Sequence, residues 1–218
     1  MCPANAISPR PAWRDRLLVR YRARGWRGFT RLYNLLKPVA TRPHVEMSTR
    51  YGSRFLLAPG DEVDSHVMRE GFYESEVLEA LRPALAGPDA VLWVVGANFG
   101  LYAAHAALYA GQNGAVFAFE PMPAAYALLN ANIADAGLRC TTVCAAVGAE
   151  NGIASFRVAA DSSFSGLKDT GRSVTVGQID VEVIALDAFA PLARLSADLI
   201  KIDVEGGEQA VLRGARNL

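Results

Sequence analysis

The stretch VLWVVGANFGLYAAHAALYAGQNGAVFAFE, residues 91–120, decides the fold. It opens with five apolar residues, Val91–Val95, which are typical of a strand buried on both faces of a parallel sheet. Glycine follows, and then an Ala- and Leu-rich segment over 99–109 predicts a helix that ends at Gly111. A second apolar run, Ala115–Phe119, completes a strand–helix–strand unit. Units of this kind predict a doubly wound α/β sheet.

The alternation of strand and helix continues after residue 120, with one interruption. The parallel elements predicted downstream are a helix over 124–136, a strand over 141–147, a strand over 198–203 and a helix from Gly207 to the chain end. The interruption consists of short alternating segments at 153–158, 173–176 and 181–184, which predict antiparallel strands inserted into the α/β fold. Upstream, the sequence predicts a short strand around 55–57 and a helix over 74–85.

The composition is that of a folded domain with an uneven distribution of charge. Of the 218 residues, 51% are hydrophobic and 20% are charged, which excludes a disordered or collagen-like chain. The 22 basic and 22 acidic residues balance overall. However, residues 1–57 hold twelve basic and two acidic residues, a local charge of +10 that leaves −10 on the remainder. We therefore divide the chain into a basic N-terminal arm, residues 1–46, and a domain over 47–218.

Within the arm, aromatic and leucine side chains recur at helical spacing over 12–36, with arginines at the other positions. An Arg-rich amphipathic helix of this kind fits the surface of an anionic membrane. It also fits packing against the acidic remainder of its own chain, which is the commoner role of such a face. Beyond the arm, the excess of acidic residues predicts no binding to nucleic acid, because the phosphates would be repelled.

Cellular location is predicted from the cysteines and from the N-terminus. Three cysteines are an odd number in a chain too long to need cross-links, so we expect no disulfide framework and interpret Cys140 and Cys144 as core residues. Arg10, Arg14 and Arg16 interrupt any secretory signal, and no apolar run reaches the ~18 residues of a membrane-spanning helix. These features predict a cytoplasmic protein.

Two features of the quoted stretch predict a site for a nucleoside. Gly96 and Gly100 follow the first strand, where glycine permits a sharp turn and the next helix offers free N–H groups. Glu120 follows the second strand, where a carboxylate can accept hydrogen bonds from ribose hydroxyls. Asn98 replaces the glycine that makes room for a pyrophosphate in dinucleotide sites. A ligand with an amino-acid tail, such as S-adenosylmethionine, therefore fits better than NAD.

A group of acidic residues follows the strand predicted over 198–203. Asp203, Glu205 and Glu208 lie at the carboxyl edge of the sheet, where open α/β folds bind ligands. Glu205 and Glu208 have an alternative role as acids at a helix N-terminus. For Asp203, an unpaired position at the end of a buried strand would be costly, so a functional role is favoured. No metal site is predicted, although a pair of these carboxylates could hold a divalent cation.

Five linked motifs resemble a known family. They are VVGANFG from Val94, VFAFEPMPAAYALLNANI from Val116, CAAVGAENG from Cys144, LDAF from Leu186 and DLIKIDVEGGEQAVLRGA from Asp198. Together with REGFYESEVLEAL from Arg69, they are similar to the FkbM family of S-adenosylmethionine-dependent methyltransferases, over roughly residues 50–218. The resemblance implies a Rossmann-like class I methyltransferase fold and methyl transfer to an oxygen of a sugar or a polyketide-like small molecule.

The resemblance also implies roles for individual residues. The residues implied for binding S-adenosylmethionine are Gly96, Ala97, Asn98, Gly100, Glu120, Tyr73 and Glu74. Glu120 would bind the ribose, and Tyr73 and Glu74 would belong to a segment that closes over the cofactor or the acceptor. Asp203 and Glu205 would line the reaction site. Asp203 is the first candidate for the base that takes the hydroxyl proton, with His66 and Glu205 behind it.

Two departures from the family pattern bear on function. Val94 stands two positions before the first glycine, where members of the family usually carry an acid that helps to hold the methionine ammonium group. The chain also ends before three further strands of the class I sheet, so we expect a fragment or truncated product whose strand at 198–203 is an open edge. Two alternatives stay open: a nicotinamide-dependent oxidoreductase on the same core, and a methyltransferase-like domain that binds without catalysing.

Overall fold

The computed structural model describes residues 45–58, 62–110, 113–135, 139–189 and 197–218. The helix predicted over 12–36 lies outside these residues. The described chain divides into two compact units, with the boundary between Ser75 and Glu76. The predicted division of the chain after residue 46 stays a prediction.

The smaller unit, residues 45–75, contains a hairpin and a helix. Strand β1 (Val45–Ser48) pairs with β2 (Arg54–Leu57) in antiparallel register, and α3 (Glu62–Glu70) follows. Arg50 joins the hairpin to the segment after α3, because its N–H donates to the carbonyl of Gly71 and its guanidinium donates to the carbonyl of Glu70. The sequence predicts β2 but neither β1 nor α3, whose short and mostly polar segments carry little periodic signal.

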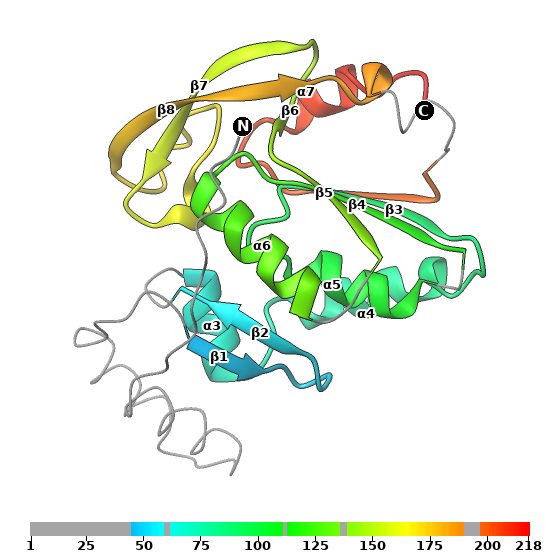
Figure 1. Ribbon diagram of the computed structural model, residues 1–218. Coiled ribbons are helices and arrows are strands. Elements are labelled where there is room, and N and C mark those ends of the chain that lie inside the picture. The colour runs from blue at the N-terminus through cyan, green and yellow to red at the C-terminus, as the bar shows by residue number, and fades with distance from the viewer. Residues whose placement is uncertain (1–44, 59–61, 111–112, 136–138, 190–196) are drawn as a thin grey trace. The chain divides into compact units, whose positions relative to one another are not determined.

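The larger unit, residues 76–218, is built on a four-stranded sheet in the order β5-β4-β3-β9 (Figure 1). The strands are β3 (Val91–Val95), β4 (Ala115–Phe119), β5 (Cys140–Val143) and β9 (Leu199–Ile202). All three neighbouring pairs run parallel. The predicted α/β class with a Rossmann-like parallel sheet is confirmed, and β3 and β4 have the predicted bounds.

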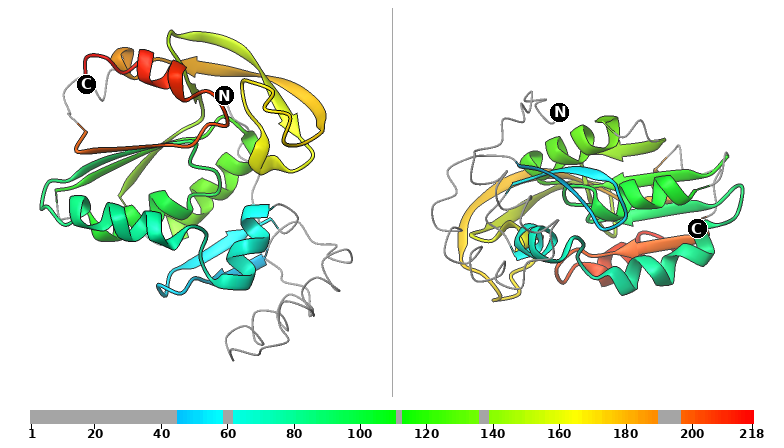
Figure 2. Two further views of the ribbon diagram at one scale, coloured as in Figure 1. Left: turned by 180° about the vertical axis from the view of Figure 1, so that it is seen from behind. Right: turned by 90° about the horizontal axis from the view of Figure 1, so that it is seen from below.

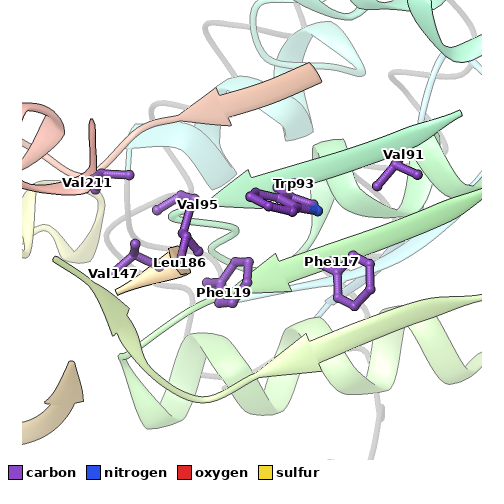
Figure 3. Close-up of a cluster of buried hydrophobic side chains, with 8 residues drawn as sticks. All are labelled: Val91, Trp93, Val95, Phe117, Phe119, Val147, Leu186 and Val211. Carbon is purple, nitrogen blue, oxygen red and sulfur yellow. The ribbon is translucent and has the colours of Figure 1, made fainter. Parts of the chain in front are cut away.

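Helices cover both faces of this sheet (Figure 2). The helices α4 (Ser75–Leu85), α5 (Leu101–Tyr109) and α6 (Pro123–Asp135) lie on one face, and α7 (Glu208–Arg213) lies on the other. Trp93 and Phe119 point to the α7 side, where they form a buried cluster with Leu186 and Val211 (Figure 3). Because β3 and β4 are covered on both faces, their apolar runs are continuous rather than alternating.

A second sheet has three strands in the order β6-β8-β7. Strand β7 (Gly152–Ala159) is antiparallel to β8 (Thr175–Ile184), and β6 (Ala146–Val147) is parallel to β8. The 3-10 helices η2 (Ser162–Phe164) and η3 (Leu186–Ala188) follow β7 and β8. The predicted insertion of antiparallel strands is confirmed.

Three predicted bounds in this region are wrong. The strand predicted over 141–147 is two strands, because the chain leaves the first sheet after Val143 and enters the second at Ala146. The segments predicted at 173–176 and 181–184 are one strand, because the residues between them stay paired with β7. The last helix ends at Arg213 and is capped by Gly214, so it does not reach the chain end. In the described chain, β9 is an edge of its sheet, as expected.

The two cysteines of the described chain differ in state. Cys140 is free and half-buried, and burial raises the pKa of its thiol to about 12, so it is not a thiolate at neutral pH. Cys144 is disulfide-bonded. The expectation that the cysteines form no disulfide is therefore wrong for Cys144.

Candidate functional site

Polar residues follow three neighbouring strands of the parallel sheet at the same edge. Glu120 follows β4, the segment Gly96–Asn98 follows β3, and Asp203 follows β9. Strand β3 lies between β4 and β9 and is parallel to both, so the three strand ends are adjacent. This is the carboxyl edge, where open α/β sheets bind ligands.

The glycine loop, residues 96–100, curls over the end of β4. The N–H groups of Gly96 and Ala97 both donate to the carbonyl of Phe119, at 3.0 and 2.9 Å. Gly96, Asn98 and Gly100 have φ values of 79°, 50° and 92°, in the left-handed region. Glycine adopts this region without strain, whereas Asn98 is a residue type that tolerates it. The sequence therefore suits the turn that the loop makes.

The glycines of this loop are required by contacts within the protein. A Cβ atom at Gly96 would overlap the carbonyl oxygen of Asp203, and one at Gly100 would lie 2.7 Å from Cδ1 of Leu129 on α6. The sequence predicts that glycine here lets a ligand approach the backbone. Instead, the space at Gly96 admits the segment after β9, and the space at Gly100 admits a side chain of α6. The roles of Gly96, Ala97 and Gly100 in binding a cofactor stay predictions.

Glu120 is held against the glycine loop. Its Oε2 accepts the N–H of Asn98 at 2.8 Å, and its Oε1 accepts the N–H of Met122 at 2.9 Å. The residue is 7% exposed. Burial raises the pKa of Glu120 to about 7, the two backbone hydrogen bonds lower it, and the negative charge of Asp203 raises it. The structure therefore brings Asn98 and Glu120 together, as the nucleoside interpretation requires.

The glycine loop has a further anchor that the sequence analysis missed. Nδ2 of Asn132, a buried residue on α6, donates to the carbonyl of Phe99 at 2.7 Å. Asn132 lies 33 residues from Phe99 in the sequence. A buried amide in the middle of an apolar helix is the signal that could have identified this contact, because buried polar side chains are nearly always hydrogen-bonded.

Asp203 differs from the expectation of a buried acid. Its side chain is 52% exposed, and its Oδ2 accepts a hydrogen bond from Nζ of Lys201 at 3.0 Å. The Lys201 side chain is only 10% exposed, and its Nζ lies 4.4 Å from the centre of the Tyr102 ring. The argument from burial is thus wrong for Asp203, since the buried charge is the lysine two residues earlier. Oδ1 of Asp203 has no hydrogen-bond partner among the described residues.

Residues 203–207, which we call the acidic turn, connect β9 to α7. Nη1 of Arg172 donates to both carboxylate oxygens of Glu205, at 3.2 and 3.0 Å. Burial raises the pKa of Glu205, and the charge of Arg172 opposes that shift. Glu208 accepts the N–H of Gly206 at 3.0 Å and lies in the first turn of α7, so it is an acid at a helix N-terminus, the alternative for this residue.

The remaining predicted site residues belong to the smaller unit. His66 and Tyr73 pack edge to face, with ring centres 5.2 Å apart. Glu74 is exposed and has a φ of 48°, which marks the end of the segment before α4. The structure thus brings His66 and Tyr73 together. The catalytic role of His66 and the cofactor-closing role of Tyr73 and Glu74 stay predictions.

Two further observations concern metals and membranes. Among the described residues, no three or more His, Cys, Asp or Glu side chains are grouped so that they could hold a metal ion. Within the same residues, every helix is too short or too polar to cross a bilayer.

Known proteins are similar to this chain over parts of its length. The chain is 29% identical over 176 residues to the hexuronic acid methyltransferase AglP of Haloferax volcanii. The match covers 80% of this chain and 69% of AglP. Among solved structures, the tRNA (uracil-54, C5)-methyltransferase of Pyrococcus abyssi matches with 11% identity and a TM-score of 0.35. TYW2 of M. jannaschii matches with 19% identity and a TM-score of 0.36.

The two solved structures are matched over only part of their chains. The first match covers 47% of this chain and 24% of the Pyrococcus protein, and the second covers 48% of this chain and 44% of TYW2. The family model for the methyltransferase FkbM domain matches residues 95–218, which is more than half of the chain. That span contains the glycine loop, Glu120 and the acidic turn. The chain belongs to the FkbM methyltransferase family.

Proposed function

We propose that the protein is an S-adenosylmethionine-dependent methyltransferase that methylates a hydroxyl group of a sugar or a similar small molecule. The observation that carries the proposal is the Glu120 carboxylate, buried at the carboxyl edge and 2.8 Å from the N–H of Asn98. Membership of the FkbM family supports methyl transfer. The cofactor and the acceptor are inferred from the residues at this edge.

These residues fit the proposed cofactor. Each carboxylate oxygen of Glu120 accepts one backbone N–H and has a further lone pair, so the group can accept hydrogen bonds from two ribose hydroxyls. The glycine loop lies directly beside it and would hold the rest of the nucleoside. When bound, S-adenosylmethionine supplies a methyl group on a positively charged sulfur, which needs no further activation.

For the acceptor, we assign Asp203 as the group that takes the hydroxyl proton. Oδ2 of Asp203 accepts a hydrogen bond from Lys201, whereas Oδ1 has no protein partner in the described chain. The Asp203 side chain is half exposed. A carboxylate fixed at one oxygen can present the other oxygen to a hydroxyl group in a defined direction. A positioned base contributes about 10²- to 10⁴-fold to rate, and holding the acceptor in line contributes about 7–11 kcal/mol.

The acceptor class is the finer part of the proposal. AglP, the relative from Haloferax volcanii, is described as a hexuronic acid methyltransferase, and this supports a sugar acid as the first acceptor to test. The assay uses labelled S-adenosylmethionine with free D-glucuronic acid, its p-nitrophenyl glycoside and the corresponding neutral glucosides. Transfer of label to a hydroxyl of any of these sugars supports the proposal. If no transfer occurs although S-adenosylhomocysteine binds, the sugar acceptor is rejected and the binding-module alternative is favoured.

The role of Asp203 is tested by Asp203→Asn. This variant should keep its affinity for S-adenosylhomocysteine while kcat falls at least about a hundredfold. Asp180→Asn, at an exposed position on β8, is the matched control and should leave both quantities unchanged. Unchanged turnover in Asp203→Asn rejects the assignment.

Binding of NAD instead of S-adenosylhomocysteine would favour the oxidoreductase alternative, and loss of activity with a chelator would indicate a metal.

Location and membrane contact also stay predictions. The cytoplasmic location that the sequence predicts is tested by fractionation of cells that express the full chain. Contact of residues 12–36 with an anionic membrane is tested by liposome binding of the full chain and of a chain that starts at Met47. Equal binding of the two would remove the membrane proposal.

A further inference from the structure

A buried arginine organises the loop between β7 and β8. We call residues 160–174 the arginine-bound loop. Arg157 on β7 is 6% exposed, although strand alternation would place a charged residue at this position on the solvent face. Its Nη2 donates to the carbonyl of Phe164 at 2.6 Å, and its Nη1 donates to the carbonyl of Ser173 at 3.3 Å and to Oγ1 of Thr175 at 3.2 Å.

Further contacts of Arg157 hold the middle of the same loop. Its Nε donates to the carbonyl of Lys168 at 3.4 Å and lies 3.7 Å from the Asp169 carboxylate. The backbone of Arg157 also exchanges two hydrogen bonds with Gly166, at 2.9 and 3.1 Å. One side chain therefore binds the arginine-bound loop at Phe164, at Lys168 and Asp169, and at Ser173. Only the planar guanidinium, with five N–H donors, can serve so many acceptors at once.

The arginine-bound loop packs directly on the acidic turn. A Cβ atom at Gly166 would lie 3.4 Å from the carbonyl oxygens of Val204 and Glu205, and one at Gly206 would lie 3.2 Å from Cγ2 of Thr170. The arginine-bound loop and the acidic turn therefore lie close together at both glycines. The arginine-bound loop thus covers one side of the acidic turn, which begins with Asp203.

Arg172 makes the polar contact between the arginine-bound loop and the acidic turn. Its Nη1 binds both oxygens of Glu205, and its guanidinium carbon lies 4.2 Å from the centre of the Phe164 ring. The Phe164 carbonyl is in turn bound by Arg157. The guanidinium of Arg172 is therefore stacked on a ring whose own position depends on Arg157, and the Arg172 side chain is 57% exposed.

We propose that Arg157 is a positioning residue for the acceptor side of the site: by binding the loop it places Arg172, and through Arg172 it fixes the Glu205 carboxylate two residues from Asp203. Arg157 itself touches neither the proposed base nor any reacting group. The expected effect of Arg157 on acceptor binding rests on the proposed function. Its structural part, that Arg157 holds the loop in place, stands independently of any activity.

The structural part is tested by tryptic cleavage. Lys168 and Arg172 are exposed in the loop, and cleavage after each is followed by mass spectrometry in the full chain. Arg157→Met should be cleaved at these two positions at least about tenfold faster than the wild type, because the loop carbonyls lose their common donor. Arg213→Met, at an exposed position on α7, is the control and should be cleaved there at the wild-type rate. Equal cleavage of Arg157→Met and wild type overturns the proposal.

The functional part is tested by steady-state kinetics with Arg172→Gln. This surface variant removes the contact with Glu205 but leaves Arg157 and its loop contacts in place, so it stays informative even if Arg157→Met does not fold. We expect the acceptor KM to rise about tenfold, with the affinity for S-adenosylhomocysteine within about twofold of wild type. Arg157→Met, where folded, should show the same split. An unchanged acceptor KM in Arg172→Gln overturns the acceptor role.

The two levels of failure are distinguishable. If the wild type transfers methyl to no sugar and binds no S-adenosylhomocysteine, the proposed function fails, and the cleavage rates alone decide whether Arg157 holds the loop. If the wild type is active and the variants do not differ from it in cleavage rate or acceptor KM, the inference about Arg157 fails and the proposed function stands.

Discussion

Replacing Glu120 by glutamine tests the electrostatic account of the site. Burial raises the pKa of this carboxyl to about 7 from an ordinary value of 4.5. At about 1.4 kcal/mol for each pH unit, this corresponds to about 3 kcal/mol. The native protein holds the proton more tightly than the unfolded chain does. The contribution of Glu120 to the free energy of unfolding is therefore complete below pH 4.5 and is lost as the pH rises through about 7.

The measurement is urea unfolding followed by far-UV circular dichroism at several pH values between about 5 and 8. Glutamine has nearly the same shape as glutamate but does not titrate. Over this range, the free energy of unfolding of the wild type should fall by about 2–3 kcal/mol more than that of Glu120→Gln. Glu150→Gln, at an exposed position after β6, should follow the wild type. If Glu120→Gln and the wild type have the same pH dependence, the reasoning is refuted.

The same variant tests the contact with ribose. Above pH 7 the wild-type carboxylate is mostly ionised, and hydrogen bonds to a charged group are worth about 1.5–3 kcal/mol. Glu120→Gln should therefore bind S-adenosylhomocysteine about 10- to 100-fold more weakly at pH 8, as measured by titration calorimetry. Equal affinities would show that Glu120 does not contact the ligand.

Two further substitutions test the glycine loop. Gly96→Ala should lower the free energy of unfolding by at least about 3 kcal/mol, because the new methyl group meets the carbonyl of Asp203 at a positive φ. Gly152→Ala, where nothing lies within 4 Å, should change it by less than about 1 kcal/mol, and similar losses in both variants would contradict the argument. Asn132→Ala should cost about 1–3 kcal/mol and weaken S-adenosylhomocysteine binding, since the Phe99 carbonyl loses this donor, and a wild-type melting temperature would contradict it.

The parallel sheet could be predicted because its strands carry a local signal. The runs at Val91–Val95 and Ala115–Phe119 are apolar at every position and end at glycine or an acid, and both match the observed strands residue for residue. Local pattern fails where pairing decides. Nothing in the apolar segment over 141–147 marks the point where the chain changes sheets, because that point is set by pairing of Ala146–Val147 with β8, far along the sequence.

The site was predictable in its loop and its acids but not in its cations. Glu120 and Asn98 could be joined because a strand–helix–strand unit always places these positions together. Lys201 and Arg157 could not be identified, since an isolated basic residue in a strand is usually solvated. Their burial depends on acceptors that the fold supplies: a carboxylate for Lys201 and the loop carbonyls for Arg157. The sequence predicts a buried Asp203 for the same reason: the strand end buries Lys201 and leaves Asp203 exposed.

The close fit of Gly96 against Asp203 has a mechanical consequence. The Asp203 N–H donates to the Val95 carbonyl at 2.9 Å, and its own carbonyl occupies the space beside Gly96, so the segments after β3 and β9 cannot shift independently. Any displacement that one ligand imposes on the first segment is transmitted to the second. If the proposed function holds, the cofactor and the acceptor are expected to bind with linked affinities, each altering the other by the same factor.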